Sequence, residues 1–493
     1  MNLFKKLAGQ TAVYGLLTIV ARFINFLLVP IHTRYLSIED YGVIGDIYAI
    51  IAFFMVIVTY GMETTFFNFT RKKDQLTPVF GTSISLLHIS SALFLGLALF
   101  FREPLAALID YAGQGQYILY MGIVLAFDAM SAIPLAYYRK VEKIWKFTLI
   151  RVSGILISVF LNVYLIAINP WFLANGYEYL SFVPYDSSKL IDYVFIANCV
   201  SSVWVYLWVL PTILKLKFSF NKAIAGKILH YTWPLLFVGM AGIINETIDR
   251  TLLRRMLVDG AYQTGIYNAF YKLSIVITLM IQAFRMGAEP FFFAQLESEN
   301  KEKVYAVILK YFVYATVIVF LLTSLFAEPI AKLLIRKAEF FEHPTGLLIV
   351  PILLLANVFL GMHYNLSIWY KAEEKTKKGA WIAVLGAAIT LIINIIFIPI
   401  YGIVASALAT LACYGGMTVL NYKWGQKYFK VPYPMKRIAL IISSAAILVA
   451  GYMWADQVFE WSNALKYGLA GSLSILYLFG WWLVEKNELK GLL

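Results

Sequence analysis

The sequence is poor in charge and nearly free of cysteine, and each shortage excludes a class of protein. Only 14% of its 493 residues are charged, and two are cysteines. Cys199 and Cys413 lie in apolar stretches, so neither a disulfide framework nor a thiolate metal site is expected. The five histidines are scattered without an HExxH pattern, and no phosphate-binding loop motif is found. No metal site and no cofactor is predicted.

The remaining composition is apolar throughout. Hydrophobic residues make up 61% of the chain and the mean hydropathy is +0.74, values too high for a soluble globule of this length. Spanning a bilayer takes roughly 20 apolar residues per helix. Fourteen such windows are centred near residues 21, 52, 90, 127, 158, 202, 242, 273, 316, 358, 389, 412, 446 and 474. We predict an all-α polytopic membrane protein with 14 transmembrane helices, the first retained rather than cleaved as a signal peptide.

The basic residues alternate between the two sides of the predicted spans. Of the 41 Lys and Arg residues, 27 lie in alternate loops counted from the N-terminus and 9 lie in the opposite loops. The positive-inside rule therefore predicts that both termini are cytoplasmic. The formal net charge of +13 could suggest nucleic-acid binding, but the cations are distributed as in a membrane protein. We therefore expect contact with membrane lipids and not with nucleic acid.

A repeat runs through the chain at a displacement of about 225 residues, the length of one six-helix unit. Three of its matched pairs are YGVIGDIY at 41 with TGIYNAFY at 264, GMETTFF at 61 with GAEPFFF at 287, and YYRKVEK at 137 with WYKAEEK at 369. We predict six-helix units at 1–220 and 221–430, followed by two additional helices at 431–493. Because six is even, the units are parallel repeats, and sites in such proteins lie between the halves.

Five cations fall inside predicted spans, where lipid disfavours charge. They are Arg22, Arg151, Arg250, Lys272 and Arg285. Each costs about 2.5 to 3.5 kcal/mol at the bilayer centre, so they should face a wet interior. Guanidinium and ammonium groups bind phosphate oxygens, and cations at graded depths suit an anionic passenger. We predict that Arg22, Arg250, Lys272 and Arg285 bind substrate, whereas Arg151 follows the basic loop before it too closely for the same assignment.

Acidic residues recur at matched places in the two units. Glu63 and Glu289 sit at the inner ends of helices 2 and 8, where they can contact cations when the inner side closes. We predict a gate there. On helix 7, Glu246 and Arg250 are spaced i,i+4 and can pair, or Glu246 or Asp249 can bind H⁺ or Na⁺. Coupling to an ion gradient is not required. Moving about two negative charges outward across an inside-negative membrane releases roughly 4 to 5 kcal/mol per 100 mV of membrane potential.

The 14-helix plan, the opening GQTAVYGLLTIVARFINFLLVPIHTRYLSIEDYGVIGDIYAI and the repeated G-x-E-x-x-F-F resemble the Wzx-type polysaccharide flippases of the multidrug/oligosaccharidyl-lipid/polysaccharide exporter superfamily. The resemblance implies a bacterial cytoplasmic membrane protein that flips an undecaprenyl-pyrophosphate-linked oligosaccharide outward by alternating access. A glycan polymerase or ligase is the implied partner. Related lipid II flippases carry cavity arginines early in helix 1 and a cation in helix 8, which Arg22 and Lys272 match, and a glutamate late in helix 2, which Glu63 matches.

Three alternatives stand beside this reading. An enzyme using the pair Glu39 and Asp40 is disfavoured, because the largest outer loop, around residues 169–189, has only about 20 residues and such enzymes carry larger catalytic loops or domains. A lipid II flippase would share the same cations. A multidrug or cation antiporter of the same superfamily should instead present acids and aromatic rings to its passenger, so the sign of the cavity distinguishes it.

Overall fold

The computed structural model describes residues 23–24, 26–70, 75–216, 218–295, 300–373, 375–459 and 461–490. Within these ranges, thirteen helices are long and apolar enough to cross a membrane. The thirteen predicted centres from residue 52 onward each fall inside a different one of them. The all-α polytopic architecture is therefore confirmed, while the first predicted helix lies largely outside the described residues.

The chain divides into two compact units. The first comprises Met1–Asn268 with Thr390–Gly402, and the second comprises Ala269–Ile389 with Ile403–Leu493. This division follows packing and differs from the predicted unit boundaries, because α11 packs on α3 within the first unit. The predicted boundaries rest on sequence similarity and stay a prediction.

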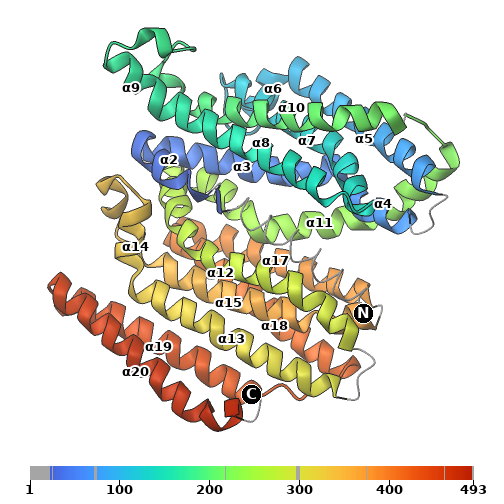
Figure 1. Ribbon diagram of the computed structural model, residues 1–493. Helices are drawn as coiled ribbons and strands as arrows, with labels where there is room; N and C mark the ends of the chain where they lie inside the picture. Colours follow the sequence, from blue (N-terminus) through green and yellow to red (C-terminus); the bar gives the residue numbers. More distant parts are fainter. Residues whose placement is uncertain are drawn as a thin grey trace. The chain divides into compact units, whose positions relative to one another are not determined.

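The first unit is built from long antiparallel helices with short connections (Figure 1). In chain order they are α2 (Val29–Tyr35), α3 (Ile38–Thr59), α4 (Met62–Phe69), α5 (Leu76–Phe100), α6 (Arg102–Leu108), α7 (Gly115–Lys140), α8 (Ile144–Val163), a π-helical turn (Tyr164–Ile168), α9 (Asn169–Ala174), 3₁₀ turns (Glu178–Leu180 and Ser187–Lys189), α10 (Leu190–Leu216) and α11 (Lys222–Met256). The Ser37 hydroxyl accepts a hydrogen bond from the Asp40 amide and so caps α3. Glu39 and Asp40 thus occupy the first turn of α3, where a helix N-terminus favours negative charge.

The second unit follows the same plan and adds a C-terminal helix pair. Its helices are the greater part of α12 (Gly260–Gln295), then α13 (Lys301–Leu325), α14 (Ala327–Leu334), a 3₁₀ turn (Ala338–Phe341), α15 (Ile349–Leu366), α16 (Ile368–Ala372), α17 (Thr376–Tyr401), α18 (Ile403–Tyr428), α19 (Met435–Phe459) and α20 (Asn463–Lys490). The same helix packing occurs inside each unit. In the first unit α7 lies against α5 and α10, and in the second unit α15 lies against α13 and α18. These are equivalent helices of the predicted repeat.

The start of α12 crosses α3 at very short range within the first unit. A Cβ atom added to Gly42 would lie 1.9 Å from the Ala261 carbonyl oxygen, and one added to Gly265 would lie 2.0 Å from the Ile38 carbonyl oxygen. Small residues permit such close backbone approach between membrane helices. Both glycines are therefore required by the crossing itself.

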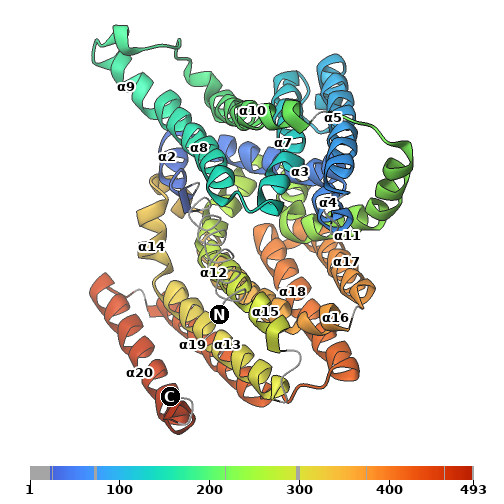
Figure 2. The same ribbon diagram turned by 45° about the vertical axis from the view of Figure 1, so that its right-hand side comes forward.

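Ion pairs tie both ends of the C-terminal helix pair to the rest of the second unit. At one end, the Lys310 ammonium of α13 lies 2.7 Å from the Glu485 carboxylate of α20, and both side chains are buried. At the other end, Lys466 contacts Glu328 and Asp456 at 2.7 and 2.5 Å. Figure 2 shows α19 and α20 running side by side. The helix pair is thus an integral part of the second unit.

Candidate functional site

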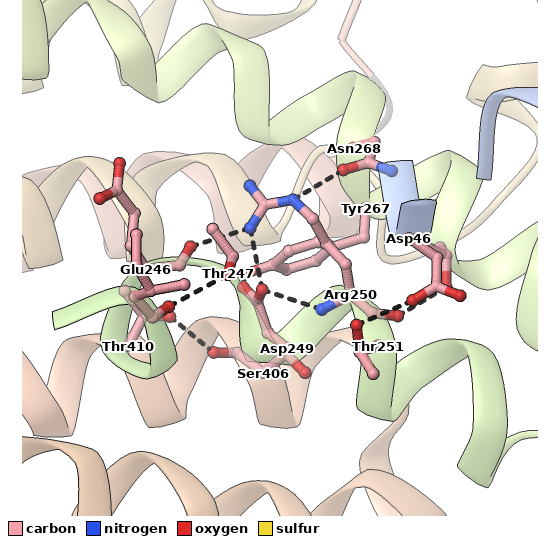
Figure 3. Close-up of polar contacts among 12 residues, drawn as sticks. Asp46, Glu246, Thr247, Asp249, Arg250, Thr251, Tyr267, Asn268, Ser406 and Thr410 are labelled. Atoms are coloured by element: carbon pink, nitrogen blue, oxygen red, sulfur yellow. Dashed lines mark hydrogen bonds and ion pairs between the residues drawn. The ribbon is translucent and has the colours of Figure 1, made fainter. Parts of the chain in front are cut away.

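Two networks of charged groups and one charged cleft stand out in the first unit. The first network surrounds Asp249 and Arg250 near the end of α11 (Figure 3). The Arg250 guanidinium donates to the Asp249 carboxylate and to the Asn268 side-chain oxygen, each at 2.9 Å. The buried Tyr267 hydroxyl donates to the second Asp249 oxygen at 2.5 Å. The charge of Arg250 is therefore compensated locally.

The carboxylate of Glu246 is not the observed ion-pair partner of Arg250 in this network. Arg250 donates to the backbone carbonyl of Glu246 at 2.9 Å, while the Glu246 side chain is exposed and points away from the guanidinium in Figure 3. The Glu246–Arg250 ion pair was one of two possibilities, and the structure pairs Arg250 with Asp249 instead; binding of H⁺ or Na⁺ by Glu246 or Asp249 stays a prediction. Asp249 is the partner instead, because Arg250 folds back across the adjacent turn where the carboxylate is fixed by Tyr267.

The second network surrounds Asp46, a fully buried carboxylate on α3. It accepts hydrogen bonds from Tyr111 and Thr251 at 2.8 Å each and from Arg255 at 3.1 Å. Burial and then the neighbouring Asp46 carboxylate raise the pKa of Tyr111, so the phenol stays protonated as a donor. Arg255 also donates to the Ile109 carbonyl at 2.9 Å. The network joins α3, α11 and the connection before α7 with its acceptors satisfied, which suits a structural joint.

The cleft lies at the opposite end of α3, where the backbone bends. Tyr60 and Gly61 adopt left-handed conformations with φ of 35° and 71°, which end α3 and start α4 in a new direction. A Cβ atom on Gly61 would also meet Leu235 at 2.9 Å. The bend places Glu63, in the first turn of α4, against Arg139 of α7, and the two form an ion pair.

Charged groups of both signs line this cleft. Its volume is about 390 Å³, and its charged lining residues are Glu63, Asp128, Arg139 and Arg151. Arg139 also lies over the rings of Phe67 and Phe147, at 5.0 and 5.8 Å from their centroids. At 1.5 Å per residue, Arg151 stands about 10 Å along α8 from its first residue, so the cations lie at different depths. The lining can hold an anion only if one of its carboxylates gives way.

The second unit has a smaller counterpart at its own basic end. Arg285 of α12 lies over the ring of Tyr364 at 4.0 Å, and both line a small cavity together with Lys371 of α16. In the repeat YYRKVEK/WYKAEEK, Lys371 is the equivalent of Arg139. Lys272 is half-buried on α12 and does not line this cavity. Cations therefore occupy equivalent positions of the two units.

Two predicted site residues lie beyond what the structure describes. Arg22 falls outside the described residues, and for Glu289 the structure describes the helix α12 but not the side chain. Their predicted roles stay predictions. Among the residues that are described, no group of three or more His, Cys, Asp or Glu side chains gathers as metal ligands would.

Sequence reasoning missed Arg139 because it was counted with the loop cations after it. Helix α7 in fact continues to Lys140, so Arg139 is a helix residue that faces the cleft. Lys310 likewise follows a cluster of basic residues typical of a loop, although it lies in the third turn of α13. The signal that could have found Arg139 is its match to Lys371 in the repeat.

Comparison with known proteins agrees with this architecture. A family model described as polysaccharide biosynthesis protein matches residues 7–294, more than half of the chain. The chain belongs to the polysaccharide biosynthesis protein family. Among curated proteins, this family member is 20% identical over 308 residues to the Lsg locus putative protein 1 of Haemophilus influenzae, covering 61% of the chain and 68% of that protein.

Two solved structures share the fold of this family member. The lipid II flippase MurJ in an inward closed conformation superposes with a TM-score of 0.72 at 16% identity, covering 96% of the chain and 99% of MurJ. An inward-facing multidrug resistance MATE transporter has a TM-score of 0.62 at 15% identity, covering 86% of the chain and 96% of the transporter. These likenesses establish the fold. The expectation of a transporter rather than an enzyme stays a prediction.

Proposed function

We propose that this protein flips a polyprenyl-pyrophosphate-linked oligosaccharide from the cytoplasmic to the outer leaflet of a bacterial cytoplasmic membrane. The observation that carries the proposal is the family match over residues 7–294, because it ties a chain of membrane helices to polysaccharide assembly. Undecaprenyl pyrophosphate is the expected carrier. Both termini are expected in the cytoplasm, and a glycan polymerase or ligase would receive the product.

The charges inside the spans support an anionic passenger. Arg139 and Arg151 line the cleft of the first unit, and Arg285 and Lys371 line the cavity of the second. Such charges are expensive in hydrocarbon and so mark wet paths. A pyrophosphate headgroup supplies acceptor oxygens that guanidinium groups bind as paired donors. We place substrate contacts at Arg285 and, by the family resemblance, at Arg22 and Lys272.

Arg250 belongs to this set only in a second conformation. Its pairing with Asp249 compensates its charge, so an incoming phosphate would have to replace that carboxylate. Asp249 would then be free to take up H⁺ or Na⁺, which is how ion coupling would enter. Without such coupling, the membrane potential alone favours outward transfer of the anion.

The proposal is tested by reconstitution into liposomes. Fluorescent undecaprenyl-pyrophosphate oligosaccharide is placed in both leaflets, and a membrane-impermeant quencher reports the fraction that changes leaflet. We expect rapid loss of fluorescence with the wild-type protein and slow loss with Arg285→Ala. Lys466→Ala, which changes a cation of the opposite end of the second unit, is the matched control and should flip normally.

Two alternative substrates are resolved by the same preparation. Fluorescent lipid II in place of the oligosaccharide tests a peptidoglycan precursor, and efflux of a fluorescent organic cation tests a drug antiporter. Flipping of neither lipid, with efflux of the cation by a folded protein, would refute the proposal. Preference for lipid II over the oligosaccharide would replace the substrate but keep the mechanism.

A further inference from the structure

The ion pair between Glu63 and Arg139 sits inside a cleft that is otherwise suited to an anion. Among the described lining residues, Glu63 and Asp128 balance Arg139 and Arg151, so their charges sum to zero. A cleft of about 390 Å³ is within the range of roughly 300 to 1,000 Å³ typical of small-molecule sites. One of the two carboxylates, Glu63, lies on a short helix that follows a bent backbone.

The contact between Glu63 and Arg139 is of a kind that another anion can replace. The two side chains are 51% and 32% exposed, and exposed ion pairs contribute little to stability. The Arg139 guanidinium is held independently of Glu63, because it lies over the rings of Phe67 and Phe147. Removing the carboxylate therefore leaves the guanidinium in place and facing the cleft.

We propose that this cleft is a phosphate-loading site, in which the phosphate of the lipid-linked substrate displaces Glu63 from Arg139 and is bound by Arg139 and Arg151. This inference rests on the proposed function for the identity of the phosphate. Glu63 acts as an internal stand-in for the headgroup. When it is displaced, the ion pair that links α4 to α7 beside the Tyr60–Gly61 bend is lost.

The depth and chemistry of the cleft fit a diphosphate better than a single carboxylate. Arg139 lies in the last turn of α7 at the basic end, and Arg151 lies about 10 Å along α8 from that end. Two guanidinium groups at different depths offer paired donors to two phosphoryl groups in succession. Lys371 occupies the position equivalent to Arg139 in the second unit, so both units present a cation at the same step of the repeat.

The experiment measures binding of inorganic pyrophosphate to the purified full-length protein in detergent by isothermal titration calorimetry at about 0.15 M salt. Glu63→Gln removes the competing charge and should tighten binding by about 1.5- to 5-fold. Arg139→Ala should weaken it about tenfold or more, and Arg139→Lys should weaken it less, because lysine keeps the charge but not the paired donors.

A control and a double variant separate this exchange from general electrostatics. Lys143→Ala removes an exposed cation four residues after Arg139 that does not line the cleft, and it should leave the affinity within about twofold. In the Arg139→Ala background, Glu63→Gln should no longer tighten binding, since the two act on one contact. Size-exclusion profiles and unfolding midpoints establish that each variant is folded.

Two results would overturn the inference. One is unchanged or weaker pyrophosphate binding by folded Glu63→Gln, and the other is wild-type binding by folded Arg139→Ala or Arg139→Lys. The flippase proposal fails by a different measurement, namely absence of lipid transfer in liposomes. If lipid is flipped normally but the variants do not change pyrophosphate binding as expected, only the loading site is refuted. If the variants change pyrophosphate binding as expected but no lipid is flipped, only the proposed substrate is refuted.

Discussion

The buried pair of Lys310 and Glu485 gives a prediction whose size follows from its contacts. The two side chains are 5% and 3% exposed, and their charged atoms lie 2.7 Å apart. Glu485 also accepts a hydrogen bond from Tyr314 at 2.5 Å and lies 3.5 Å from Arg437, a second cation. The Lys310 ammonium lies over the rings of Tyr311 and Tyr314, at 4.7 and 5.8 Å, which offset a charge less well than a carboxylate does. The two single variants should therefore differ.

Glu485→Gln withdraws the carboxylate from a buried ammonium and should cost about 3 to 5 kcal/mol. Lys310→Met is milder, about 1 to 3 kcal/mol, because Arg437 and Tyr314 still contact the carboxylate. The double variant Lys310→Met with Glu485→Leu replaces both charges by apolar groups and should be within about 1 kcal/mol of the wild type, or more stable.

The unfolding midpoint of the purified protein, followed by intrinsic fluorescence during heating in one detergent, ranks the four proteins. We expect the wild type and the double variant to be highest, Lys310→Met to be intermediate and Glu485→Gln to be lowest. If the double variant unfolded as early as Glu485→Gln, the loss would come from packing around α20 and not from the broken pairing of Lys310 with Glu485. Equal midpoints for both single variants would contradict the part assigned to Arg437.

Further predictions concern other elements. Burial disfavours the charged form of Glu328, but hydrogen bonds from Lys332 and Lys466 outweigh that effect and lower the pKa of Glu328. The stability of the protein should therefore fall as the pH drops below about 4, and it should fall less in Glu328→Gln. The measurement is the unfolding midpoint as a function of pH. Gly42→Leu should destabilise by about 1 to 3 kcal/mol or more, whereas Gly96→Leu, with open space at its Cβ, should not. An inside-negative potential of 100 mV, set with potassium and valinomycin, should accelerate outward flipping, since about 2.3 kcal/mol is released per negative charge.

Sequence reasoning located the helices well because the bilayer imposes a single strong requirement on each span. About 20 apolar residues with internally satisfied backbone groups are needed wherever the chain crosses, so every predicted centre from residue 52 to residue 474 lies in a membrane-length helix. The bend at Tyr60 and Gly61 does not alter hydropathy and was not anticipated. It nevertheless decides where Glu63 points.

The partners of the charged side chains were much less predictable. Spacing along one helix suggested that Arg250 pairs with Glu246, yet the observed partners come from the adjacent residue and from α12. Asp46 lies within a predicted span, and its contact with Arg255, some 209 residues away, has no local signature in the sequence. Periodicity reports which face of a helix a residue occupies, and it contains no information on which other helix that face meets.

The repeat does carry such long-range information, and the crossing of α3 and α12 shows how. Gly42 and Gly265 are equivalent residues at a displacement of 223, and so are their contact residues Ile38 and Ala261. Gly42 approaches the carbonyl of Ala261, and Gly265 approaches the carbonyl of Ile38, so the two approaches mirror each other and the crossing is symmetric. Because the match in the sequence brings together two glycines that also meet across two helices, the repeat identifies a contact that spacing along a single helix cannot predict. The absence of side chains at both equivalent positions is what lets the two backbones approach so closely.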